Sequence, residues 1–179
     1  MTRGDRASVE ALATSISTAL SRAGIHAVLS GGAAVTVYSD GRYQSADIDF
    51  VTNETLALIA PVMERLGFRK GPGRHFEHPD HELVVEFVAG PLAFGEDEIG
   101  GDHAMREHPD GTLLIVTPTQ CVMDRLAAAF HWNDPQAREQ ALLVAARQEL
   151  DLDRLRRWAR REGRAEDFDR FVSELSART

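Results

Sequence analysis

The chain contains 179 residues, 43% of them hydrophobic, which suits one cored domain, or one domain with a helical appendage, better than two large independent domains. Its formal net charge of -8 disfavours an extended nucleic-acid surface and leaves only a local basic groove open. The single cysteine, Cys121, cannot form an internal disulfide, and no early apolar stretch resembles a signal peptide or a membrane span. We therefore expect a soluble cytoplasmic protein that makes no membrane contact.

The first two thirds of the chain alternate between helical and strand patterns. Apolar side chains at helical spacing predict helices over 8–22 and 54–66, and a further helix is expected over 33–38. Short apolar runs predict strands at 27–29, 46–52, 74–77, 82–88 and 112–116. The remaining long segment, 89–111, is expected to be a functional flap or to be poorly ordered.

Beyond Pro118 the pattern is helical to the end of the sequence. Helices are predicted over 119–130, 135–150, 152–162 and 165–177. Asp134, directly before Pro135, is expected to cap the second of them. These patterns together predict an α/β fold in which a small mixed sheet flanked by helices occupies 1–116 and a C-terminal helical segment occupies 117–179.

A turn of small residues, Ser30-Gly31-Gly32, follows directly after the first strand pattern. If a helix begins after this turn, the backbone N–H groups of the two glycines are free to face an anion such as a phosphate. The alternative is a plain strand-to-helix connection, for which Gly-Gly is an ordinary solution.

Two aspartates, Asp47 and Asp49, stand two positions apart within the strand predicted at 46–52. Alternate strand residues share a face, with Cα atoms roughly 6.6 Å apart, so both carboxylates could reach the same one or two divalent cations. Glu86 is the candidate third ligand, because an acid in an apolar run is costly to bury without a cation or a donor. The alternatives are an exposed strand edge for the aspartates and a half-solvated strand face for Glu86.

The order of these features resembles the nucleotidyltransferase superfamily that includes DNA polymerase beta, and the resemblance covers 28–88. It implies that Ser30-Gly31-Gly32 holds the triphosphate of a nucleoside triphosphate substrate. It also implies that three acids bind one or two Mg²⁺ ions and assist deprotonation of an acceptor hydroxyl: Asp47, Asp49 and Glu86. The chain departs from the family pattern in a longer spacing between the glycines and the aspartates, and in a glutamate where aspartate is more usual.

The helical tail, which begins at Thr117, is similar to the segment that follows the core in small bacterial stand-alone members and in members resembling abortive-infection toxin components. Many relatives place a lysine on this first helix, whereas this chain has Met123 there. We expect Arg125 to clamp the triphosphate instead, because a planar guanidinium can hold phosphate oxygens through two bonds. Alternatively, Arg125 pairs with its neighbour Asp124 on the surface. Trp132 could stack on a base, but we expect it to pack on the helical core.

Three histidines, His75, His78 and His81, lie among acidic residues and invite a zinc hypothesis. The Pro79-Asp80 pair between them indicates a hairpin, on which the three side chains would not obviously converge. We therefore do not expect a zinc site.

The chemistry expected from this site is transfer of a nucleoside monophosphate from a nucleoside triphosphate to a hydroxyl, with release of pyrophosphate. The acceptor could be a small molecule, a protein side chain or an RNA end, and the acidic composition favours the first two. One alternative is a slow or non-catalytic nucleotide-binding regulatory module, such as half of a toxin-antitoxin pair with an antitoxin partner. A weaker alternative is a purely structural helical partner protein.

Overall fold

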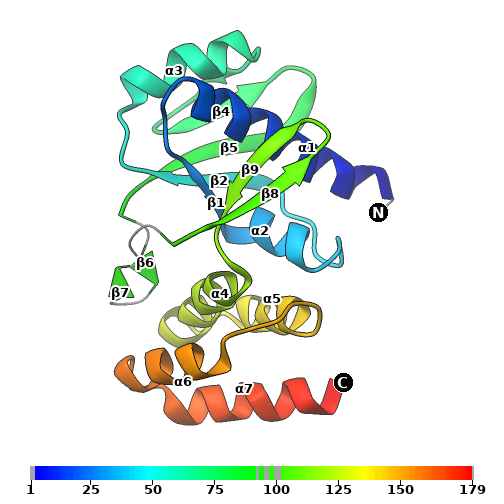
Figure 1. Ribbon diagram of the computed structural model, residues 1–179, viewed down its shortest axis with the longest axis vertical. Coiled ribbons are helices and arrows are strands. Elements are labelled where there is room, and N and C mark those ends of the chain that lie inside the picture. The colour runs from blue at the N-terminus through cyan, green and yellow to red at the C-terminus, as the bar shows by residue number, and fades with distance from the viewer. Residues whose placement is uncertain (1–2, 92, 95–96, 99–101, 179) are drawn as a thin grey trace.

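The structure, a computed structural model, describes residues 3–91, 93–94, 97–98 and 102–178. It is a mixed α/β fold in which helices flank a seven-stranded sheet, as the sequence predicted (Figure 1). The helices are α1 (Arg3–Arg22), α2 (Gly31–Tyr38), α3 (Leu56–Arg65), α4 (Pro118–Trp132), α5 (Pro135–Ala145), α6 (Leu152–Arg161) and α7 (Ala165–Arg178). The strands are β1 (Val28–Ser30), β2 (Asp47–Thr52), β3 (Arg69–Lys70), β4 (His75–His78), β5 (His81–Ala89), β6 (Ala93–Phe94), β7 (Asp97–Glu98), β8 (Ala104–His108) and β9 (Gly111–Ile115).

The sheet has the strand order β3-β4-β5-β2-β1-β9-β8, and β6 and β7 form a separate hairpin. Strand β2 runs antiparallel to β1 and parallel to β5, and β1 runs parallel to β9. Antiparallel hairpins extend the sheet on both sides, because β4 pairs with β5 and β8 pairs with β9. This topology brings the strand that carries the two aspartates directly beside the strand that carries Glu86.

One face of the sheet packs on α1 and α3 and forms the core. On β2, Ile48 and Phe50 are fully buried, whereas Asp47 is exposed and Asp49 is half-buried. Such alternation is expected of a strand that turns one face to the core and the other away from it. Phe87 of β5 stacks on Phe50, with ring centroids 5.9 Å apart, and so fixes the register of the two strands on the core side.

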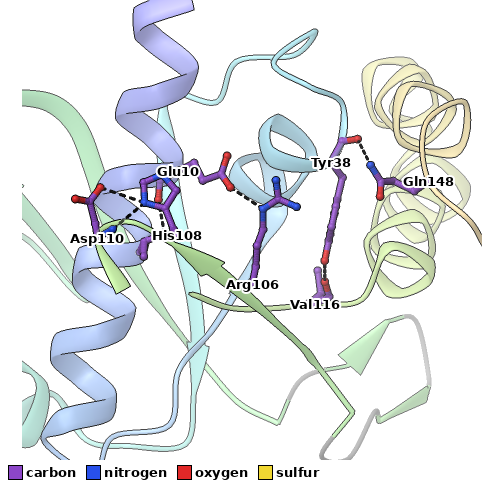
Figure 2. Close-up of polar contacts among 8 residues, drawn as sticks. Glu10, Tyr38, Arg106, His108, Asp110, Val116 and Gln148 are labelled. Atoms are coloured by element: carbon purple, nitrogen blue, oxygen red, sulfur yellow. Dashed lines mark hydrogen bonds and ion pairs between the residues drawn. The ribbon is translucent and has the colours of Figure 1, made fainter. Parts of the chain in front are cut away.

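Helix α2 joins the sheet to the C-terminal helices, which lie below it in Figure 1. All eight residues of α2 are buried. At its end the Tyr38 hydroxyl donates a hydrogen bond of 2.6 Å to the carbonyl of Val116, and Gln148 Nε2 donates one of 2.9 Å to the carbonyl of Tyr38 (Figure 2). One hydrophobic cluster includes residues from Val9 in α1 to Phe171 in α7. The division of the chain at 116–117 falls in the link between β9 and α4, and its status as a domain boundary stays a prediction.

Replacing Tyr38 with phenylalanine is expected to lower the free energy of unfolding by about 1–2 kcal/mol, because it removes a hydrogen bond in a buried place. The measurement is urea unfolding followed by circular dichroism. Tyr43→Phe is the matched control, since the Tyr43 hydroxyl makes no hydrogen bond within the described residues. Equal losses in the two variants would show that the bond from Tyr38 to Val116 contributes nothing.

The second half of the segment 89–111 contains a regular edge strand, which corrects the prediction of a flap or a poorly ordered connection for that half alone. Strand β8 pairs with β9 along its whole length, and Arg106 Nε donates a hydrogen bond of 2.6 Å to Glu10 Oε1 on α1 (Figure 2). No residue of β8 is fully buried, so the strand shows no apolar alternation in the sequence. The positions 92, 95–96 and 99–101 lie outside the described residues. No helix in the described ranges is long and apolar enough to cross a membrane.

Candidate functional site

The glycine turn lies against the strand that carries the aspartates. Ser30, the last residue of β1, pairs with Asp49 in the antiparallel ladder. Gly31 has a φ of +62°, and a Cβ added there would overlap Oδ2 of Asp49 and lie 3.3 Å from its Cγ. A Cβ added at Gly32 would lie 2.5 Å from Oγ of Ser45. The turn therefore does more than connect a strand to a helix, because two side chains flanking it need the space that the glycines leave.

The three acids predicted for the site lie on one face of the sheet. In the parallel ladder between β2 and β5, Asp49 pairs with Glu86 and Asp47 pairs with Val84. Paired residues of neighbouring strands point to the same side, and Asp47 shares a side with Asp49 because they are two positions apart. Asp47, Asp49 and Glu86 thus occupy the face opposite the hydrophobic core.

The electrostatics of Asp49 show how closely the acids lie. Burial raises the pKa of Asp49 from its ordinary value of 3.8 to about 7, and the neighbouring carboxylates of Asp47, Glu86 and Asp124 add to the rise, while Arg125 opposes it. Burial disfavours the charged form, and each nearby negative charge disfavours it further. Burial is thus the larger cause of the rise, and the neighbouring acids add to it.

Two of the acids already have partners. Asp47 Oδ1 accepts a hydrogen bond of 2.8 Å from Ser45 Oγ, and His75 Nε2 lies 3.2 Å from Glu86 Oε1. In the described part of the chain, no group of three or more His, Cys, Asp and Glu side chains is arranged to hold a metal ion. The donor chemistry nevertheless suits Mg²⁺, which prefers carboxylate oxygens, and the acids beside Asp49 favour a cation. The three residues match such an ion in donor type and share a face, but they are not arranged around one position, and Ser45 and His75 engage two of them.

Helix α4 approaches the acids from the C-terminal half of the chain. It begins at a capping box in which Thr117 Oγ1 accepts from the backbone N–H of Gln120, while Gln120 Oε1 accepts from that of Thr117. Arg125 lies on its second turn. The pKa of its guanidinium is raised, because the effects of Asp124 and, more weakly, Asp49 outweigh the lowering by burial. Residues 124 and 125 of α4 therefore lie within electrostatic reach of Asp49.

The sequence left open whether Arg125 faces the site or pairs with Asp124 on the surface. Arg125 donates to Asp124 Oδ2 through Nη2 at 2.6 Å and through Nε at 3.1 Å, and through Nη1 to Gln140 Oε1 at 3.3 Å. Its side chain is only 20% exposed. Arg125 thus pairs with Asp124, as the alternative interpretation predicted. The pair is largely buried, however, and does not lie on the open surface.

The aromatic and histidine predictions have mixed outcomes. The expectation that Trp132 packs on the helical core is wrong, because its side chain is 80% exposed, and the buried tryptophan is Trp158. The predicted hairpin at Pro79-Asp80 is confirmed, since β4 and β5 pair on either side of it. His75 lies beside Glu86, whereas His78 packs edge-on against Phe68, with ring centroids 5.0 Å apart.

Three residues near the site were not assigned to it from the sequence. His75 was considered only for zinc, Asp124 only as the neighbour of Arg125, and Ser45 not at all. Ser45 has a local signal, because a short hydroxyl residue two positions before an aspartate on an extended segment can bond to it. The contact of His75 with Glu86 has no local sequence signal, because it depends on how β4 pairs with β5.

Comparisons of this chain with protein-family models, with curated proteins and with solved structures give no match.

Proposed function

We propose that this protein is a metal-dependent nucleotidyltransferase that moves a nucleoside monophosphate from a nucleoside triphosphate to a hydroxyl acceptor and releases pyrophosphate. The observation that carries the proposal is the register of β2 and β5, which sets Glu86 beside Asp49 on the face that Asp47 shares. The glycine turn that touches Asp49 supports it, because phosphate oxygens need backbone N–H groups close to the metal-binding acids. The order of these features is also that of the nucleotidyltransferase superfamily.

On this proposal Asp47, Asp49 and Glu86 hold one or two Mg²⁺ ions and help to deprotonate the acceptor hydroxyl. When bound, the metal supplies charge stabilisation to the attacking and leaving oxygens. Ser30-Gly31-Gly32 orients the triphosphate through backbone groups, and Arg125 adds a permanent positive charge beside it. The acidic composition favours a small molecule or a protein side chain over RNA as the acceptor.

A second candidate is a nucleotide-binding regulatory module that turns over slowly or not at all, such as the partner of an antitoxin. The observation that favours it is the engagement of site residues within the chain: Glu86 with His75 and Arg125 with Asp124. His75 contacts only Oε1 of Glu86, so an active enzyme must bind its cation through the other oxygen of Glu86 or release this contact. A regulatory module has no such requirement.

The test is a panel of α-labelled nucleoside triphosphates, incubated with the full chain, Mg²⁺ and a cell extract as the source of acceptors. We expect label transfer by the unmodified protein and a loss of at least about 1000-fold in the variants Asp47→Ala and Asp49→Ala. Glu86→Ala is expected to lower both the rate and the Mg²⁺ affinity while the fold survives, because it removes one of several mutually repelling charges.

The matched controls are Asp169→Ala on α7 and Glu64→Ala on α3, two exposed acids outside the site. Both controls should transfer label at the rate of the unmodified protein. Nucleotide binding without transfer in every sample would favour the regulatory module. Transfer that persists in Asp49→Ala would refute the proposed site.

A further inference from the structure

The two edges of the seven-stranded sheet differ in the features that keep an edge strand from pairing with another chain. The edge strand β3 has only two residues, Arg69 and Lys70, both exposed, and its neighbour β4 shifts register against β5. Short length, positive charge and irregular pairing all protect an edge. The edge strand β8 has five residues in regular register with β9, and it contains no lysine and no proline. Strand β8 therefore lacks the protection that β3 has.

The charged side chains of β8 do not shield its edge. Arg106 Nε donates to Glu10 Oε1 on α1 at 2.6 Å (Figure 2), and the carboxylate of Glu107 accepts from Thr112 Oγ1 on β9 at 3.2 Å. Both charges are thus bonded within their own chain, while the apolar side chain of Met105 is 71% exposed. One arginine and one glutamate also leave β8 without formal net charge, in a chain whose total is -8.

The backbone groups of Met105 and Glu107 point to the free side of β8. Leu114 and Thr112 of β9 lie opposite these two residues. The backbone N–H groups of Leu114 and Thr112 donate to side-chain hydroxyls of α1, each at 3.0 Å, and so are turned away from β8. In an antiparallel ladder such pairs exchange no hydrogen bonds, and the N–H and C=O groups of both members point outward. Among the described residues, no backbone group bonds to those of Met105 and Glu107 on that side.

We propose that β8 pairs in antiparallel orientation with β8 of a second copy of this chain, so that the two sheets continue into one across a two-fold axis. Such pairing satisfies backbone groups that β9 leaves unbonded. The two-fold arrangement also closes the assembly, because both edges that remain are the protected strand β3. With the axis perpendicular to the sheet, the candidate acids of both copies lie on the same side. The inference does not depend on the proposed function.

Charge selects the register of the paired strands. A two-fold axis that pairs the outward-facing residues can pass through Met105, Arg106 or Glu107. The second position sets Arg106 opposite itself and the third does so for Glu107, and like charges directly opposite each other are destabilising. The axis through Met105 instead brings the two exposed methionines together and sets Arg106 opposite Ala104. In that register Glu107 lies opposite His103, the residue before β8. An apolar centre flanked by complementary polar pairs is thus the arrangement we infer.

The first test is sedimentation velocity of the full chain at about 1–300 µM. Two short strands make a small interface, so we expect a dimer with a dissociation constant of about 10–100 µM. Met105→Lys sets two ammonium groups opposite each other and should weaken the dimer at least about 10-fold. Trp132→Lys is the matched control, because Trp132 is also a large exposed hydrophobic residue but ends α4, and it should leave dimerisation unchanged. Circular dichroism checks that both variants keep the fold.

The second test is disulfide cross-linking under mild oxidation, with Met105→Cys and Glu107→Cys as the variants. The natural Cys121 is buried and does not compete. In the proposed register the two positions 105 lie about 5.5 Å apart between Cα atoms, within disulfide range. The two positions 107 are displaced by four residues, roughly 13 Å along the strands, which is too far. We expect Met105→Cys to form covalent dimers at least about 10-fold faster than Glu107→Cys.

Four results would overturn the inference. A chain that stays monomeric at every concentration would leave the edge of β8 to some other partner. A dimer that persists in Met105→Lys would use another surface, and loss of the dimer in Trp132→Lys would place the contact at the end of α4. Equal cross-linking rates for the two cysteine variants would indicate random collisions. None of these results bears on the proposed nucleotidyl transfer.

Discussion

Replacing Asp49 with asparagine is expected to stabilise the metal-free protein and to abolish the proposed nucleotidyl transfer. Burial and the carboxylates of Asp47 and Glu86 raise the pKa of Asp49 to about 7, so its ionised form is unfavourable in the folded chain. Asparagine keeps the shape and removes the charge. A purely structural carboxylate in a bonded network would behave in the reverse way, because its removal would destabilise the fold.

The pH dependence follows from the direction of this shift. The ordinary pKa of the group is 3.8 and the folded value is about 7, so the unfolded chain ionises first as the pH rises. The folded protein therefore loses stability, relative to the asparagine variant, between about pH 4 and pH 7, and the difference stays constant above that range. A shift of one pKa unit corresponds to about 1.4 kcal/mol. Since Asp49 is not fully buried and solvent screens its neighbours, we expect a gain of about 2 kcal/mol at pH 8.

The measurement is urea unfolding of the metal-free protein at several values between pH 4 and pH 8. Asp169→Asn on α7 is the matched control and should leave the stability unchanged, because that side chain is exposed. Added Mg²⁺ should raise the unfolding midpoint of the unmodified protein and have less effect on Asp49→Asn, since a ligand stabilises only the state that binds it. A variant less stable than the parent at pH 8 would contradict this description of the site.

The predictable parts of the fold are those in which burial of one face gives the sequence a periodic spacing of apolar residues. Helix α1 and strands β2 and β5 each turn one face to the core, and their apolar spacing shows it. Strand β8 has no buried residue, so it left no pattern. Helix α5 was predicted to reach position 150 but ends at Ala145, which lets Gln148 bond to the carbonyl of Tyr38. The spacing of residues within one segment cannot predict contacts of that kind between distant segments.

The same distinction applies to the candidate site. The shared face of Asp47 and Asp49 follows from their spacing within one strand, and no other part of the chain can change it. The face of Glu86 depends on the register between β2 and β5, and a slip by one residue would turn it into the core. Trp132 was assigned to the core because large aromatics are usually buried, but the corner between α4 and α5 leaves it exposed.

Replacing Gly31 with alanine is expected to lower the free energy of unfolding by about 3 kcal/mol, through two separable causes. The first is the backbone, because Gly31 has a φ of +62°, which costs an L-residue about 1–2 kcal/mol. The second is the overlap of the new Cβ with Oδ2 of Asp49, since added atoms in a filled space typically cost about 1–3 kcal/mol. The measurement is urea unfolding at neutral pH.

Gly24 separates the two causes, because it has a φ of +75° and an added Cβ there would meet nothing within 4 Å. Gly24→Ala should therefore show only the backbone cost, about 1 kcal/mol. In the double variant Gly31→Ala/Asp49→Ala, the cost of the alanine should fall to the same value, because the obstructing carboxylate is gone. If Gly31→Ala costs no more than Gly24→Ala, the Asp49 side chain does not obstruct a Cβ at position 31. The glycine turn would then not hold the Asp49 carboxylate in place, and the proposed transfer would lose this support.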